Sequence, residues 1–212
     1  MTAANQPAML PIDTVLPDLL ASLRQHPTVL LSAAPGAGKT TRVPLALLQE
    51  PWLADKRIIM LEPRRLAARN AARFMAQQLG EAVGEQVGYR IRLDNKVSAR
   101  TRMEVVTEGI LTRMLQDDPQ LTDVGLIIFD EFHERHLASD LALALSLQAQ
   151  ALLRDDLKLL IMSATLDSDA LSSALNAPFI ASAGRSFAVD IQYRPLPNAN
   201  SQLIEHCARV IH

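Results

Sequence analysis

The chain has 212 residues, a length that favours one domain and excludes a complete multidomain machine. Apolar residues make up 49% of the chain and the formal net charge is −2, which excludes a disordered charged tail and predicts a sizeable core. The single cysteine, Cys207, excludes an internal disulfide scaffold. The longest uncharged apolar run, 141–153, is too short to cross a bilayer, and residues 1–10 lack the pattern of a secretory signal. We therefore expect a cytoplasmic protein without a membrane partner.

Apolar, β-branched runs alternate with helical segments along the chain, which predicts an α/β fold: a doubly wound, mostly parallel sheet with helices on both faces. The predicted strands are Val29 to Ser32, Arg57 to Leu61, Val87 to Ile91, Met103 to Val106, Leu126 to Phe129 and Leu159 to Met162. The predicted helices are Thr40 to Gln49, Leu66 to Leu79, Gly109 to Gln116 and Ser139 to Leu153.

The last part of the chain has a different character. A strand-like segment, Val189 to Arg194, runs into a cluster of Pro and Asn residues that is typical of a linker, and 201–212 then resembles a helix cut off in its course. We expect residues 1–195 to form one domain and 196–212 to hold a linker and the start of a second, truncated domain.

Positive charge is concentrated in the middle of the chain. Between Lys56 and Arg113 there are 12 Lys or Arg residues against 6 Asp or Glu, so the rest of the chain carries a net charge of −8. Most of these cations are arginines, whose forked donors suit phosphate groups. A solvated arginine-rich surface is equally compatible with the charge alone.

A glycine-rich segment follows the first predicted strand and opens the first predicted helix, which is the context of a phosphate-binding loop. Backbone amides of Gly36, Ala37 and Gly38, with the helix start at Thr40 and Thr41, are expected to face the phosphates of a nucleotide. Lys39 should reach the β- and γ-phosphates, and the Thr40 hydroxyl should bind Mg²⁺. Pro35 has no N–H and contributes no donor.

Two carboxylates end the strand 126–129. Asp130 and Glu131 should lie at the carboxyl edge of the sheet, where α/β proteins bind ligands. Asp130 is suited to hold Mg²⁺, and Glu131 to orient and deprotonate an attacking water. No third ligand is spaced to form a metal site with His133 and His136, and we interpret His133 as a hydrogen-bonding coupler.

The segment 130–135, Asp-Glu-Phe-His-Glu-Arg, resembles motif II of the DEAH-box helicases, with Phe132 in place of the usual Ala. Segments 62–68, 107–111 and 163–165 are similar to motifs Ia, Ib and III of that family, in the same order. The Asp-Glu-Phe-His variant and its flanks point to the bacterial HrpB branch. The resemblance covers about 10–194, the family's first RecA-like domain.

The resemblance implies an ATP-dependent RNA helicase motor that uses ATP and Mg²⁺. It assigns phosphate binding to Lys39 and Thr40, magnesium to Asp130 and water activation to Glu131. It assigns His133, Ser163 and Thr165 to coupling between the nucleotide and domain movement. Single-stranded RNA would contact Arg64, Arg65, Arg92, Thr107 and Gly109, through backbone contacts that do not read sequence.

A base-stacking residue is less clear. Many family members have an Arg on the helix after motif Ia, and Phe74 aligns with it, beside Arg73. Phe74 is either an aromatic replacement for that Arg or a core residue that faces the sheet.

The family's motifs IV, V and VI, with the arginines that stabilise the transferring phosphoryl group, lie on a second RecA-like domain and are not in this sequence. Such arginines contribute roughly 10³ to 10⁵ in turnover, so we expect a monomeric fragment that binds nucleotide and hydrolyses it slowly until that domain is supplied. The alternatives are another enzyme of the phosphate-loop class, such as a small-molecule kinase, and a non-hydrolysing module that binds nucleic acid or protein.

Overall fold

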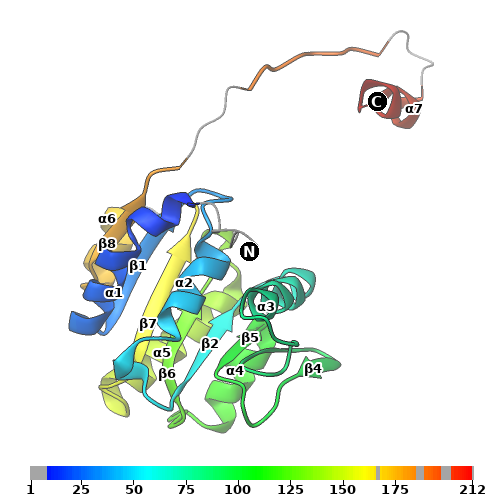
Figure 1. Ribbon diagram of the computed structural model, residues 1–212. Coiled ribbons are helices and arrows are strands. Elements are labelled where there is room, and N and C mark those ends of the chain that lie inside the picture. The colour runs from blue at the N-terminus through cyan, green and yellow to red at the C-terminus, as the bar shows by residue number, and fades with distance from the viewer. Residues whose placement is uncertain (1–8, 166–167, 185–188, 197–201, 212) are drawn as a thin grey trace, which may run out of the picture.

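The computed structural model of the chain describes residues 9–165, 168–184, 189–196 and 202–211. Its centre is one eight-stranded sheet with the order β4-β3-β5-β2-β6-β7-β1-β8. Figure 1 shows this sheet with most of its strands labelled. Neighbouring strands are parallel except β3 and β4, which pair antiparallel. The strands are β1 (Thr28–Ala33), β2 (Arg57–Leu61), β3 (Val87–Ile91), β4 (Asp94–Lys96), β5 (Met103–Val106), β6 (Val124–Phe129), β7 (Lys158–Ser163) and β8 (Phe179–Ser182).

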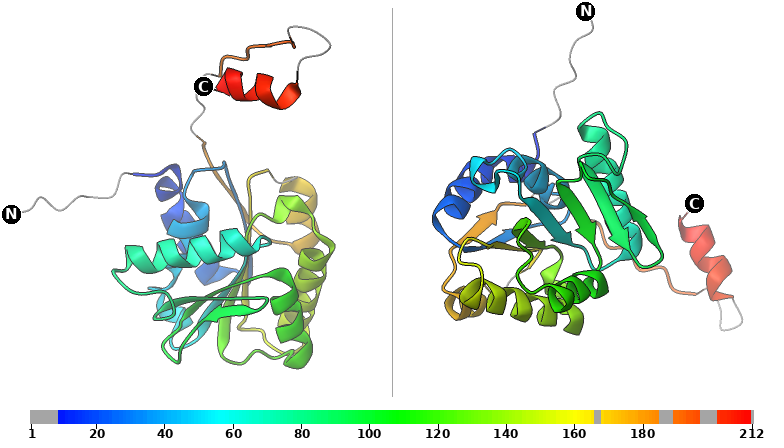
Figure 2. Two further views of the ribbon diagram at one scale, coloured as in Figure 1. Left: turned by 90° about the vertical axis from the view of Figure 1, so that its right-hand side faces the viewer. Right: turned by 90° about the horizontal axis from the view of Figure 1, so that it is seen from below.

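Helices cover both faces of the sheet, in the two layers that Figure 2 shows. One face packs against α1 (Leu16–Gln25), α2 (Lys39–Leu47) and α3 (Arg65–Gln78), and the other against α4 (Glu108–Asp117), α5 (Leu137–Leu152) and α6 (Ser168–Leu175). Three 3₁₀ turns, η1 (Pro11–Thr14), η2 (Pro51–Leu53) and η3 (Phe132–Glu134), complete the domain. The fold is the predicted doubly wound α/β architecture.

Alternation along the strands builds a core on each face. In β1, Val29 and Leu31 join the cluster under α1 to α3, whereas Leu30 joins the cluster under α4 to α6. All three side chains are fully buried. Because successive side chains of a strand point to opposite faces, a strand that is apolar at every position fits only between two helical layers.

The parallel strands bring distant segments to one edge of the sheet. The carboxyl ends of β1, β2, β5, β6 and β7 lead into the phosphate-loop, Ia, Ib, II and III segments, respectively. These strands are neighbours in the order β5-β2-β6-β7-β1. The five segments, separated by up to 130 residues in the sequence, therefore meet at this carboxyl edge.

The strand predicted at Val189 to Arg194 is wrong: described residues 189–196 have no regular structure. The side chains of Val189, Ile191 and Tyr193 are exposed, so this segment has neither the strand partner nor the buried face that a strand requires. The helix predicted near the end is confirmed as α7 (Leu203–Ile211), which has no buried residue and lies apart from the sheet in Figures 1 and 2. No described helix is long and apolar enough to span a membrane.

Candidate nucleotide site and nucleic-acid interface

The phosphate loop connects β1 to α2 through two glycines in the left-handed region. Gly36 has φ +76° and Gly38 has φ +97°. A Cβ at Gly38 would lie 2.7 Å from Leu10 Cδ1, the end of a flexible side chain, so the left-handed φ is the main reason for glycine there. The Ile12 amide donates to the Ala37 carbonyl at 3.1 Å, which fastens the loop to η1. This support from η1 has no counterpart in the sequence-based prediction.

Two short contacts join the start of α2 to the end of β6. The Lys39 ammonium lies 2.6 Å from Glu131 Oε1, and the Thr40 hydroxyl donates to Asp130 Oδ2 at 2.6 Å. Lys39 is only 4% exposed, so its charge is neutralised inside the protein by Glu131. A cavity of about 350 Å³ opens beside these groups and is lined by Leu10, Pro35, Gly36, Gly38, Lys39, Thr40, Thr41 and Glu131. The structure thus brings the predicted phosphate, metal and water-activating residues together.

Burial acts on the carboxylate of Asp130. Loss of solvent raises the pKa of Asp130 to about 6, although the hydrogen bond from Thr40 and the charge of Lys39 lower it. A divalent cation bound here would favour the ionised carboxylate. Hard oxygen donors of this kind, with phosphate oxygens and waters, suit Mg²⁺.

Glu62, directly after β2, is a third carboxyl group at this edge, and the sequence alone did not predict a role for it. Its side chain is buried and accepts a hydrogen bond from the Arg64 amide at 3.3 Å. Burial and the charge of Asp130 raise the pKa of Glu62 to about 7. Its place after an apolar strand is the same signal that identified Asp130.

The motif II turn, η3, lies against the motif III segment. His133 Nδ1 lies 3.4 Å from both the Ala164 amide and Glu131 Oε2, so its tautomer decides whether it accepts from the first or donates to the second. Ser163 Oγ donates to the Thr165 carbonyl at 2.8 Å, and the Thr165 amide donates to Ser163 Oγ at 3.2 Å. His133 thus lies between Glu131 and motif III, and its coupling role stays a prediction.

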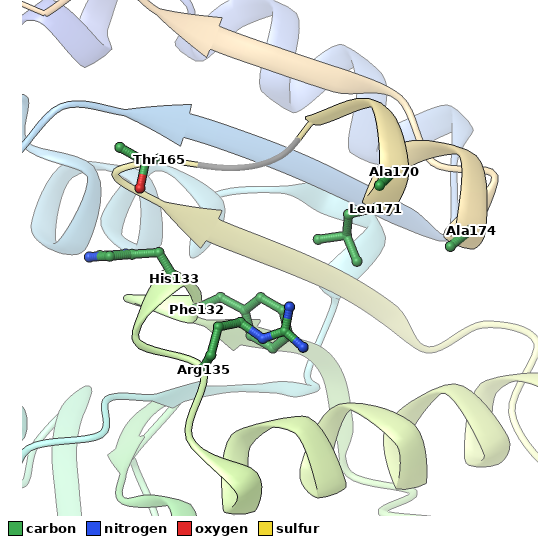
Figure 3. A pocket seen from close by; sticks show the side chains of 7 residues that line it. All are labelled: Phe132, His133, Arg135, Thr165, Ala170, Leu171 and Ala174. Atoms are coloured by element: carbon green, nitrogen blue, oxygen red, sulfur yellow. The ribbon is translucent and has the colours of Figure 1, made fainter.

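A cavity of about 430 Å³ lies between η3 and α6, with the lining residues that Figure 3 labels. Phe132 is buried at its floor, with the Arg135 guanidinium 5.6 Å from the ring centroid. The ring of Phe132 also packs edge-on against Phe129 of β6. The larger side chain at this motif II position therefore adds apolar contacts beneath the turn.

The residues predicted to bind single-stranded RNA lie along the same carboxyl edge of the sheet. Arg64 and Arg65 begin α3 and are exposed, and Arg65 Nη2 donates to the Arg92 carbonyl at 3.0 Å. Arg92 is exposed in the turn between β3 and β4. Thr107 and Gly109 flank the start of α4, where Gly109 is exposed and has no atom within 4 Å of an added Cβ.

The core interpretation of Phe74 is wrong. Phe74 is 48% exposed on α3, beside exposed Arg73, while the buried side chains of this helix are Ala68, Ala71, Ala72, Met75 and Ala76. Helix α3 packs beside α2, the helix that follows the phosphate loop, on one face of the sheet. Phe74 and Arg73 are therefore exposed on the same helical layer as that loop. Contact with a base stays a prediction.

Comparisons with known proteins agree with this geometry. Over 189 residues the chain is 60% identical to ATP-dependent RNA helicase HrpB of Escherichia coli (strain K12), covering 89% of this chain and 23% of that protein. It is 37% identical over 191 residues to ATP-dependent RNA helicase HrpA of the same organism, covering 90% of this chain and 15% of that protein. The chain therefore spans less than a quarter of the length of these curated relatives.

Solved structures show the same likeness. A crystal structure of the Escherichia coli DEAH/RHA helicase HrpB superposes with a TM-score of 0.88 at 57% identity, covering 95% of this chain and 26% of that one. A second, of the E. coli DExH-box NTPase HrpB, has a TM-score of 0.83 at 56% identity and covers 98% of this chain and 26% of that one. The family model of the DEAD/DEAH box helicases matches residues 13–173, and the chain belongs to that family.

Proposed function

We propose that this chain is the ATP-binding motor domain of an ATP-dependent RNA helicase. The observation that carries the proposal is the double contact of Lys39 with Glu131 and Thr40 with Asp130, beside a loop with two left-handed glycines. It unites a phosphate-binding cation, a hydroxyl and carboxylate for Mg²⁺, and a base for water in one place. The relatives' names, ATP-dependent RNA helicases, support the same reading.

The residues have separate roles in the proposed reaction. Lys39 leaves Glu131 and pairs with the phosphates, which frees Glu131 to orient a water and take its proton as that water attacks the γ-phosphorus. Thr40 and Asp130 would hold Mg²⁺, which when bound neutralises charge on the β- and γ-phosphates. The bond between the γ-phosphorus and the β–γ bridging oxygen breaks, and ADP carries that oxygen away.

The domain boundary belongs to the same proposal. Residues 1–195 form the first RecA-like domain, and 196–212 begin the connection to a second. The arginines that speed phosphoryl transfer would come from that second domain, so this chain by itself binds nucleotide as a monomer and turns it over slowly. Single-stranded RNA would lie across Arg64, Arg65, Arg92, Thr107 and Gly109, and Phe74 or Arg73 would stack on the base of the nucleotide.

Nucleotide titration tests the site. Lys39→Ala removes a charge-assisted contact worth about 1.5 to 3 kcal/mol, so ADP–Mg should bind roughly 10- to 100-fold more weakly by calorimetry. Lys56→Ala is the matched control, because Lys56 pairs with Asp156 at the opposite edge and its loss changes the charge equally. Equal ADP affinities in the two variants would remove Lys39 from the site.

Turnover tests the proposed reaction. ATP hydrolysis by the 212-residue chain is measured with and without single-stranded RNA, against Glu131→Gln. We expect nucleotide binding with almost no turnover. RNA-stimulated turnover that is lost in Glu131→Gln would show that the missing arginines are supplied in another way and would contradict our account of slow hydrolysis.

A further inference from the structure

Arg64, which we propose to contact single-stranded RNA, already has an anionic partner within the protein. Its guanidinium Nη2 pairs with Glu134 Oε1, although the two residues are 70 positions apart in the sequence. The Arg64 side chain is 64% exposed and that of Glu134 is 22% exposed. Exposed ion pairs are weak, so a phosphate group can displace Glu134 from Arg64 at small cost.

Glu134 is also fixed to the water-activating residue. Glu131 directly precedes the η3 turn and Glu134 ends it, and the Glu134 amide donates to the Glu131 carbonyl at 3.0 Å. Glu131 before the turn and Arg135 after it each have φ +51°, a left-handed conformation that such residues rarely adopt. Buried Phe132 anchors the turn from below. A shift of Glu131 is therefore transmitted through three residues of constrained backbone to Glu134.

His136 extends the connection to the motif Ib segment. Its Nδ1 lies 2.9 Å from Glu108 Oε1, and its Nε2 lies 3.7 Å from Glu134 Oε2. Glu108, the first residue of α4, also accepts a hydrogen bond from Ser139 Oγ at 2.6 Å. The side chains of Arg64, Glu134, His136 and Glu108 thus form a continuous chain from motif Ia through motif II to motif Ib.

We infer that Glu134 and His136 are positioning residues that couple the nucleotide site to the proposed RNA contacts at the carboxyl edge of the sheet. The Glu134 carboxylate pairs with Arg64 in the place that an RNA phosphate would take. His136 contacts the same carboxylate and also Glu108, which lies between Thr107 and Gly109 in the sequence. When Lys39 leaves Glu131 for a nucleotide phosphate, the turn readjusts and changes the hold of Glu134 on Arg64. The inference rests on the proposed function, because it assigns the route by which that function is coupled.

The affinity of the chain for single-stranded RNA tests this role. Binding of a fluorescent oligouridine of about 12 nucleotides is measured for this chain with and without ADP–Mg. Glu134→Gln frees Arg64 and should raise the nucleotide-free affinity about two- to fivefold over the wild type. It should also reduce the change in affinity that ADP–Mg causes by about twofold or more. Glu85→Gln, which breaks the Arg100–Glu85 pair before β3 at the opposite edge, changes the charge equally and should leave both quantities near wild type.

A double-mutant cycle separates positioning from general charge. In an Arg64→Ala background, Glu134→Gln should have no further effect on strand affinity. His136→Gln, which loses one of the two imidazole contacts, is a second variant and should also reduce the ADP–Mg effect while melting within a few degrees of the wild type.

The outcomes distinguish two failures. A wild-type chain that binds ADP–Mg and oligouridine, with Glu134→Gln equal to Glu85→Gln, overturns the coupling route and leaves the proposed function intact. An undiminished effect of Glu134→Gln in the Arg64→Ala background also overturns it. A folded wild-type chain that binds neither ligand overturns the proposed function, and the coupling route with it.

Discussion

Carboxylates at the carboxyl edge of the sheet occupy unequal environments. Glu131 is paired with Lys39, Asp130 accepts a hydrogen bond from Thr40, and Glu62 accepts one from the Arg64 amide. Burial, with the charge of Asp130, raises the pKa of Glu62 from 4.5 to about 7 and outweighs the amide and the charge of Arg64, which lower it. Glu62, like Asp130, therefore destabilises the fold when it is ionised, and its pKa is the higher of the two.

Glu62→Gln should make the fold more stable at alkaline pH. Between pH 4.5 and about 7 the folded state keeps a proton on Glu62 that the unfolded state has lost, so the free energy of unfolding falls as pH rises through this range. The shift corresponds to at most about 3 kcal/mol, and the amide avoids this loss. Urea unfolding of both proteins in EDTA, from about pH 5 to 8, should show a stability difference that grows with pH. Asp117→Asn, an exposed carboxyl-to-amide change on α4, is the control; a pH-independent difference for Glu62→Gln would contradict the assignment.

Elements at the opposite edge are joined by one buried arginine. Arg154, just after α5, donates from Nη1 to the Gln120 and Leu121 carbonyls and from Nη2 to the Val124 carbonyl. Its Nε donates to Asp156 Oδ1 at 2.7 Å. The hydrogen bond from Arg154, with that from Lys56, holds the pKa of Asp156 well below its usual range. A single forked side chain thus fixes the end of α5 against the loop that enters β6, far from the nucleotide.

Arg154→Ala should destabilise the protein without changing its ligand affinity. It leaves three carbonyls without this donor and removes the main partner of Asp156, so we expect a loss of about 2 to 4 kcal/mol in urea unfolding. Arg154→Lys keeps the positive charge but loses the forked guanidinium donors. Its free energy of unfolding should lie between those of the wild type and Arg154→Ala. ADP–Mg affinity of the folded protein should stay within twofold of wild type. A large loss of affinity in a folded Arg154→Ala protein would show that the two edges are coupled.

The sequence predicts the elements that have strong local signals. The bounds of β2, β3 and β5 agree with prediction, because each is a short, largely apolar segment between polar residues. Helix α1 was missed, although Leu19 and Leu23 are fully buried, because no motif or strand precedes it. The segment 189–194 has the alternation of a strand but pairs with no described strand. Local sequence does not show whether a neighbouring strand is present.

The same distinction holds within the site. Pairing of Lys39 and Thr40 with the end of β6 follows from a shared sheet edge, and this part was predictable from motif positions. The pairing of Arg64 with Glu134, and the buried setting of Glu62, depend on side-chain directions after folding. No local pattern reports a contact between positions 64 and 134, so these features required the structure.

Across the whole molecule, several cations of the basic middle of the sequence pair with carboxylates of the same fold. Arg57 and Arg90 both pair with fully buried Glu104, at 2.8 and 2.7 Å. Arg69 pairs with Asp94 at 2.6 Å, and Arg100 pairs with Glu85. The charge surplus therefore overstates the surface available to nucleic acid. Of the predicted strand contacts, the cationic ones are Arg64, Arg65 and Arg92, all at the carboxyl edge.

The salt dependence of strand binding should report this small number of cations. Three neutralised phosphates predict a slope of about −2 for the logarithm of the association constant against the logarithm of salt concentration, whereas contacts from all ten arginines between Lys56 and Arg113 would give about −7. Anisotropy titrations of labelled oligouridine between roughly 50 and 200 mM salt measure the slope. Arg65→Ala should reduce its magnitude by about 0.7, and Arg113→Ala, exposed on α4 beside Asp117, should not change it. A wild-type slope near −7 would mean that the RNA also contacts arginines that pair within the fold, and that the proposed interface is too small.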